Sequence, residues 1–291
     1  MLTAAAQANL LVTALLVYAT ATTLRAGIFS VAPAGFAAIG GYSVAILTTK
    51  SHWTFLPSAA VGVLCALVVS VVIALPILRL TGVYAALATL AFLVVLGSVV
   101  TTLKVTGGSL GLYGIPAADV RPALWVALAA NVAVWYWVDH SSWGRRIDVT
   151  CESPVLAASM GINVPAVRLG AMAYSALLGA IAGSLYAHTF YVISPTVFAF
   201  SLAISVAALT VIAGSGHWLT PLISTFTVGV IPLAFQGLNN WGLIIQGALM
   251  TIVVVVYPDG LAGLARRLVM PPRATLTAAP VRPAFRWLAW L

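Results

Sequence analysis

Acidic side chains are scarce in this sequence, where five Asp and Glu residues stand among 291. Charged residues of both signs make up only 6% of the chain, against about 25% in an average soluble domain. Apolar residues make up 62%, and the mean hydropathy is +1.11. This composition leaves no room for a separate soluble domain and predicts an all-α, polytopic integral membrane protein.

The few carboxylates also bear on the type of transport. Asp119, Asp139, Asp148, Glu152 and Asp259 all fall at the ends of apolar runs or between them. A carrier driven by protons or sodium usually keeps an ionisable group inside the membrane, and none is expected here. Because backbone carbonyls alone can hold sodium, an autonomous secondary carrier or channel for a small solute remains an alternative function.

Sequence motifs for nucleotide hydrolysis and catalysis are lacking as well. Neither Lys50 nor Lys104 follows a glycine, so the chain has no GK[ST] phosphate-binding loop, and any active transport must take its energy from a partner. The four histidines are scattered without metal-ligand spacing. We therefore expect no enzyme activity, no cofactor and no metal. A membrane enzyme or structural subunit would need a clustered catalytic set that the sequence does not show.

Cysteine is equally rare. Only two cysteines occur, Cys65 inside an apolar run and Cys151 in a more polar stretch. We expect them to lie in different environments, which predicts neither a disulfide nor a cysteine metal site.

Basic residues are more frequent, and they give the chain a net charge of +8. In a soluble protein this charge would suggest nucleic acid, but the arginines here sit mostly at the ends of apolar runs, as the positive-inside effect requires. Nucleic-acid binding is therefore not expected, and the surrounding medium is membrane lipid. Arg145, Arg146 and Arg168 predict that the stretch 139–168 is cytoplasmic, and the arginines after residue 265 predict a cytoplasmic C-terminus.

Apolar runs of roughly 20 residues, the length of one crossing, predict a bundle of about eight to ten transmembrane helices. In the second run, Pro33, Gly35, Gly40 and Gly41 predict a broken or re-entrant helix that lines a cavity. If all runs cross, the N-terminus lies outside, whereas a re-entrant second run would place it inside. The predicted spans are 8–24, 31–48, 55–78, 81–101, 122–138, 168–190, 198–215, 219–238 and 241–258.

Small residues recur at helical spacing in the run 168–190, and they include Gly179 and Gly183 four positions apart. In lipid, such faces let helices approach closely. Packing inside the subunit is the favoured interpretation, and an interface between subunits is the alternative.

The stretch 139–168 is the longest interruption between apolar runs, and it contains a short helix with readable ends. Ser153 suits the N-cap, Pro154 the first helical position and Gly161 a left-handed stop. The body of this helix, Val155 to Met160, is small and apolar, and a helix this short is marginal in water by itself. It is either a surface turn between two spans or an element that docks onto this protein's own spans or onto a partner.

Six segments carry a family resemblance. They are GFAAIGGYSVAIL (35–47), RLTGVYAALATLAF (79–92), TGGSLGL (106–112), the central stretch 143–187, SPTVFAFSLAI (194–204) and YPDGLAGL (257–264). Each segment alone is weakly specific. Together, in this order and over most of residues 28–267, they resemble the permease subunits of ABC importers for branched-chain amino acids, the LivM-like subunit in particular.

The resemblance implies one membrane permease domain over residues 1–267, with a coupling loop at 139–168, and a cytoplasmic tail over 268–291 that contains Pro and Arg. The chain would form half of a translocation pathway in the bacterial inner membrane, for branched-chain or related amino acids or other small organic solutes. Its implied partners are a sister permease (LivH-like), two cytoplasmic ABC ATPases that drive transport, and an extracytoplasmic solute-binding protein.

The resemblance also implies roles for single residues. The short helix would fit into a cleft on an ATPase and transmit the closure of that subunit. The residues implied in ATPase coupling are Arg145, Arg146, Glu152, Pro154, Ala157, Ala158, Met160 and Gly161. Those implied on the side of the pathway that faces the binding protein are Gly107, Gly108, Ser109 and Gly111. Segment 214–224 departs from the family pattern, which leaves the solute open.

Overall fold

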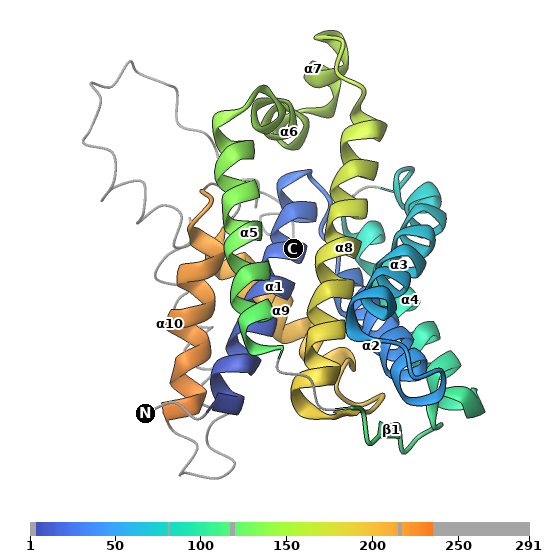
Figure 1. The fold of residues 1–291 in the computed structure, drawn as a ribbon. Helices are drawn as coiled ribbons and strands as arrows, with labels where there is room; N and C mark the ends of the chain where they lie inside the picture. Colours follow the sequence, from blue (N-terminus) through green and yellow to red (C-terminus); the bar gives the residue numbers. More distant parts are fainter. Residues whose placement is uncertain (1–3, 81, 117–119, 215–216, 235–291) are drawn as a thin grey trace, which may run out of the picture.

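The computed structural model describes residues 4–80, 82–116, 120–214 and 217–234, which form a bundle of long helices with a short helical cap at one end (Figure 1). The long helices are α1 (Ala4–Arg25), α2 (Ala32–Lys50), α3 (Phe55–Ile77), α4 (Val83–Thr102), α5 (Arg121–His140), α8 (Val164–Phe190), α9 (Phe200–Ala213) and α10 (Thr220–Ala234). The shorter elements are η1 (Lys104–Thr106), β1 (Leu112–Tyr113), α6 (Ser142–Glu152), α7 (Pro154–Ser159) and β2 (Val192–Ile193). The predicted all-α fold is confirmed.

Five of the described helices, α1, α2, α3, α4 and α8, are long and apolar enough to cross a membrane. α5, α9 and α10 run beside them and coincide with predicted spans to within a few residues. The predicted span 241–258 and the predicted tail 268–291 lie outside the described residues. The chain is a multi-pass membrane protein.

The two ends of the bundle carry different elements. α6 and α7 cap one end, and the N-terminal end of α1 lies at the other together with β1 (Figure 1). The ammonium group of Lys50 donates a hydrogen bond to the carbonyl of Val105, just ahead of β1 (3.1 Å). Lys50 thus lies at the end opposite to α6 and α7, as the alternation of spans predicts.

Glycines bring α2 and α8 into backbone contact, and we refer to this interface as the α2–α8 seam. A Cβ atom at Gly183 would lie 1.9 Å from the carbonyl oxygen of Ala37, and one at Gly40 would lie 2.3 Å from that of Ala180. Gly179 faces the start of α2 in the same way. No side chain larger than hydrogen fits at these positions, so the small residues of α8 serve packing inside the subunit. The favoured interpretation is confirmed.

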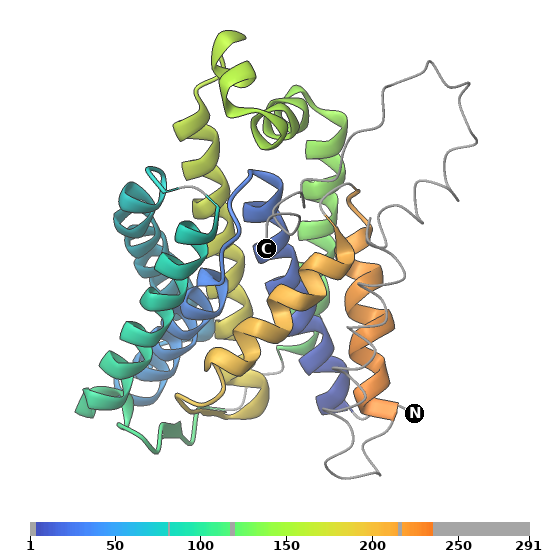
Figure 2. The ribbon, with the colours of Figure 1, turned by 180° about the vertical axis from the view of Figure 1, so that it is seen from behind.

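The prediction of a broken or re-entrant helix at 31–48 is wrong, because α2 is continuous from Ala32 to Lys50. Its glycines are used for close packing and not for a break. The irregular backbone lies just before it, in the extended link 26–31 between α1 and α2 (Figure 2). Most of this link is buried in protein, with Gly27 exposed, and the Thr89 hydroxyl accepts a hydrogen bond from the Val31 N–H (3.2 Å). Non-helical backbone is tolerated at membrane depth only under such cover.

α3 and α4 form an outer layer of the bundle. In their most apolar stretches only 28% and 22% of the residues are buried, against 72% in both α1 and α2. Their exposed side chains are large and apolar, among them Leu64, Val68, Val72, Val94 and Val95. In lipid such a face is in its natural solvent, so α1, α2 and α8 supply the core.

Candidate coupling site

The stretch predicted as a loop with one short helix contains two helices. α6 begins after Ser141, whose hydroxyl accepts a hydrogen bond from the Trp143 N–H (3.2 Å) and serves as N-cap. Gly144 lets α6 cross the end of α5 closely, because a Cβ there would lie 2.3 Å from the Val138 carbonyl oxygen. Sequence reasoning missed α6, although a serine cap followed by mixed polar and apolar residues is a usable signal.

The second helix, α7, has the predicted ends. The Ser153 hydroxyl accepts a hydrogen bond from the Leu156 N–H (3.2 Å), and Pro154 occupies the first turn. Gly161 follows the helix at φ +77°, the left-handed conformation that favours glycine. The Asn163 side chain then caps α8 by accepting the Ala166 N–H (3.1 Å). Both caps of α7 are confirmed, and the fold therefore fixes where this short helix begins and ends.

α7 projects beyond the rest of the cap (Figure 1), and its apolar side chains are exposed. Val155 is 81% exposed and Met160 is 64% exposed, and Leu156 and Ala158 are exposed as well. We call these four residues the apolar tip. Ala157, by contrast, is fully buried against other parts of this chain. It is therefore a residue implied in ATPase coupling that does not face a partner.

The polar residues implied in coupling lie on α6. Arg145, Arg146 and Glu152 are all exposed, and the guanidinium of Arg146 lies over the ring of Trp143, 5.6 Å from its centre. The structure therefore places a basic, partly aromatic surface next to the apolar tip.

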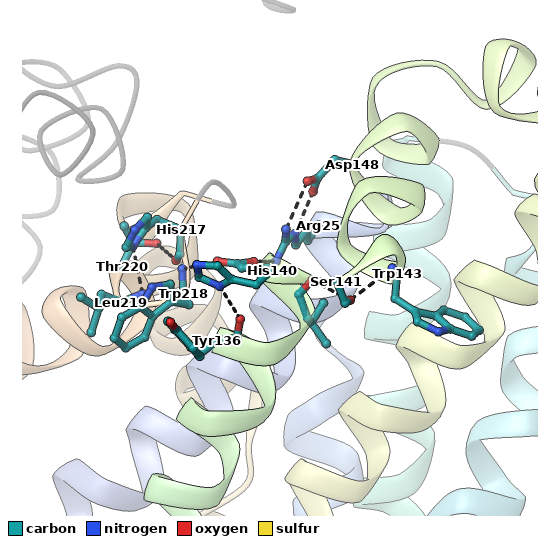
Figure 3. Close-up of polar contacts among 12 residues, drawn as sticks. Arg25, Tyr136, His140, Ser141, Trp143, Asp148, His217, Trp218, Leu219 and Thr220 are labelled. Carbon is teal, nitrogen blue, oxygen red and sulfur yellow. Dashed lines mark hydrogen bonds and ion pairs between the residues drawn. The ribbon is translucent and has the colours of Figure 1, made fainter. Parts of the chain in front are cut away.

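A buried arginine joins this cap to the long helices, as Figure 3 shows. Arg25, at the end of α1, donates from Nε to Asp148 Oδ1 (2.8 Å) and from Nη2 to Asp148 Oδ2 (3.2 Å). Its Nη1 donates to Asp139 Oδ1, at the end of α5. We call these three residues the Arg25 cluster. Sequence reasoning placed Asp139 and Asp148 only at the ends of apolar runs or between them, and it paired neither of them with Arg25.

The Arg25 cluster also reaches the link before α10. Asp139 Oδ2 accepts a hydrogen bond from the Trp218 N–H (3.0 Å), and the Tyr18 hydroxyl donates to the Trp218 carbonyl (2.8 Å). The Arg25 guanidinium lies 5.7 Å from the centre of the Trp135 ring. One guanidinium and its partners thus connect α1, α5, α6 and the start of α10.

Cys151 lies beside this cluster. Its sulfur is 3.8 Å from the carbonyl oxygen of Leu24. Burial, followed by the negative charges of Asp148 and Glu152, raises the pKa of the Cys151 thiol, and Arg168 and Arg25 act in the opposite direction. Cys65 is on α3, and both thiols are free.

The residues implied on the binding-protein side meet in one turn at the opposite end of the bundle. Gly107, Gly108 and Gly111 all have positive φ, and a Cβ at Gly111 would lie 2.2 Å from the Ile193 carbonyl oxygen in β2. Ser109 is exposed at the apex. Backbone conformation and close packing account for the glycines of this turn, and their contact with a binding protein stays a prediction.

Potential metal ligands do not gather in the part of the chain that the structure describes, where no group of three or more His, Cys, Asp or Glu side chains is placed to hold an ion. His188 is buried in α8, with its ring edge-on to that of Phe55 (4.8 Å between centres). This position fits a helix-packing role.

Sequence relatives of the chain are permeases. It is 26% identical over 274 residues to the high-affinity branched-chain amino acid transport system permease protein LivM of Escherichia coli (strain K12), and 26% identical over 279 residues to the LivM protein of Salmonella typhimurium. The fructose import permease protein FrcC of Rhizobium meliloti is 24% identical over 131 residues, which are 42% of this chain and 36% of the relative.

Coverage differs between the chain and these relatives. Each LivM alignment covers 80% of this chain but only 63% of the relative. No solved structure matches the chain. The family described as the permease component of branched-chain amino acid transport systems matches residues 2–254, which is most of the sequence. The helical bundle and its short capped helix are consistent with this match. The chain therefore belongs to the family of permease components of branched-chain amino acid transport systems.

Proposed function

We propose that the chain is the permease subunit of an ABC importer, forms half of the translocation pathway and takes its energy from partner ATPases. The observation that carries this proposal is α7, a six-residue helix capped at both ends that presents exposed apolar side chains from the arginine-bearing end of the bundle. The family match and the LivM relatives support the same function.

The physical argument concerns what α7 gains from a partner. A helix of this length is marginal by itself, and its apolar tip is exposed at the end that the arginines assign to the cytoplasm. Burying a side chain such as Val155 or Met160 in a partner's cleft is worth about 1.5–3 kcal/mol each. Closure of the ATPases around α7 would then shift the spans between inward- and outward-facing arrangements.

The proposed assembly has three further kinds of subunit. One of two cytoplasmic ATPases binds at α7, a LivH-like sister permease completes the pathway, and an extracytoplasmic solute-binding protein docks near the turn formed by residues 107–111. The proposed location is the bacterial inner membrane with a cytoplasmic C-terminus, since arginines gather at the α6–α7 end and after residue 265. The permease itself catalyses no reaction.

The proposed solutes are branched-chain or related amino acids. The printed names of the two LivM relatives support this class. A largely apolar groove between α4 and the start of α9, lined among others by Leu93, Gly97, Pro195 and Phe198, is suited to an aliphatic side chain. The fructose permease match covers less of both chains and carries less weight.

Two substitutions in α7 test the proposal in the assembled importer. Gly161→Pro is incompatible with φ +77° and removes the stop of the helix, and Ala158→Glu places a charge in the apolar tip. Each is expected to abolish ATPase co-purification and the uptake of radiolabelled leucine while membrane insertion is unchanged. Ser142→Glu, exposed at the start of α6 where an acid is favourable, is the matched control and is expected to behave as wild type.

The autonomous carrier or channel makes the opposite prediction. Under that alternative, the purified chain moves leucine in liposomes without any ATPase, and the α7 variants transport normally. Either result would refute the importer function.

A further inference from the structure

The contacts between α6 and the long helices matter because a partner that displaces α7 also displaces the neighbours of α7 in the chain. α6 is joined to α1 by the paired hydrogen bonds between Asp148 and Arg25 and by the Cys151 thiol against the Leu24 carbonyl. Charged, paired hydrogen bonds are about twice as strong as neutral ones. The Asp148–Arg25 pair is therefore the main polar attachment of α6 to α1.

The two carboxylates of the Arg25 cluster are not equivalent. The side chain of Arg25 is 8% exposed and that of Asp139 is 13% exposed, whereas that of Asp148 is 51% exposed. Asp139 also accepts the Trp218 N–H. Removing one partner of a buried ion pair is strongly destabilising, whereas a half-exposed partner can be changed at a smaller cost. The cluster thus has a buried pair, Arg25 with Asp139, and a half-exposed contact to Asp148 that a substitution can break while the buried pair stays intact.

We propose that Arg25 is a positioning residue for transport: it carries displacement of α6 and α7 to α1 and, through Asp139, to α5 and the start of α10. This proposal rests on the proposed function of α7. Arg25 touches neither the ATPase nor the solute in this scheme. It acts through Asp148 on one side and Asp139 on the other, so that the cap, α1, α5 and the start of α10 move together.

The proposal predicts a specific defect. When the Asp148–Arg25 pair is lost, α7 still binds its ATPase and hydrolysis still proceeds, but the spans no longer follow. Leucine uptake per ATP hydrolysed should then fall by at least about fivefold, the lower end of the usual coupling between sites. A purely structural role for Arg25 would lower the amount of folded complex and leave this ratio unchanged.

Asp148→Asn is the test variant, because it keeps the shape of the side chain and removes its charge. Ser142→Ala is the control, since Ser142 is an exposed polar residue on the same helix that is not among those implied in ATPase coupling. Both are assembled with the sister permease, the ATPases and the binding protein in liposomes. The uptake of radiolabelled leucine and ATP hydrolysis are measured together, and co-purification of the ATPases is measured in parallel.

The outcomes separate the two proposals. A normal uptake ratio in Asp148→Asn, or loss of ATPase co-purification in this variant, would each overturn the role of Arg25. Normal transport by the α7 variants would instead overturn the proposed function. A lowered ratio in Asp148→Asn with normal ATPase co-purification, together with a normal ratio in Ser142→Ala, supports the positioning role.

Discussion

The α2–α8 seam and the Arg25 cluster hold the same bundle by different means. In the seam, glycines allow backbone contact, with Gly183 against Ala37 and Gly40 against Ala180. In the cluster, Arg25 is shared between two carboxylates from α5 and α6. The seam is stabilised by close packing that cannot change gradually. The cluster is stabilised by charge and includes one half-exposed partner. Of these two contacts, the cluster is therefore the one that can rearrange.

Arg25→Met should have the largest effect on stability. It leaves two carboxylates without their cation, and breaking a buried ion pair in this way costs about 3–5 kcal/mol. The thermal unfolding of the purified chain in detergent is the measurement. Arg79→Met, at an exposed arginine beyond the end of α3, is the control and should leave the unfolding temperature nearly unchanged.

A compensating variant sharpens this prediction. When Asp139→Asn and Asp148→Asn are added to Arg25→Met, no unpaired charge remains, and part of the lost stability should return. If the triple variant is less stable than Arg25→Met alone, the cluster is not held together by charge.

Gly183→Ala should have the next largest effect, since the new methyl group would lie 1.9 Å from the Ala37 carbonyl oxygen. Overpacking of this kind costs about 1–3 kcal/mol, measured by the same thermal unfolding. Gly170→Ala is the control on the same helix, at an exposed position with open space around it, and it should be neutral or slightly stabilising. Equal effects at both positions would show that the seam is not a close contact.

Ser153→Ala should have a smaller and local effect. It removes the acceptor for the Leu156 N–H and should destabilise α7 by about 1 kcal/mol. Amide hydrogen exchange in residues 155–160 should become faster while exchange in α8 is unchanged. Ser159→Ala, at the other end of α7, leaves the cap in place and serves as control. Unchanged exchange after Ser153→Ala would show that the cap does not hold α7.

The rate at which Cys151 is labelled should show the smallest of these effects. Because the pKa of this thiol is raised, the thiolate is less populated at neutral pH than in a free cysteine, and labelling by a soluble maleimide should be slow and should rise steeply with pH. Asp148→Asn removes a charge that raises this pKa, so it should speed labelling at neutral pH. The experiment uses Cys65→Ser so that only one thiol reacts, and slower labelling in Asp148→Asn would contradict the assignment.

The same comparison explains what could be predicted from the sequence. Caps and spacings are local, so Ser153, Gly161 and the glycines of α8 predicted their structural roles correctly. The Arg25 cluster joins residues 114 and 123 positions apart, and no local pattern indicates which charges will meet. The break expected in α2 was wrong for a related reason: the preference of glycine for turns yielded to close packing with α8, which depends on a distant segment.

The short sheet at the end opposite to α7 has a further consequence. β1 pairs with β2 with Leu112 opposite Ile193 and Tyr113 opposite Val192, which ties the loop after α4 to the loop after α8. These are main-chain hydrogen bonds, and they do not depend on protonation or on ionic strength. We therefore expect the spacing between these two loops to stay unchanged when α6 and α7 are displaced.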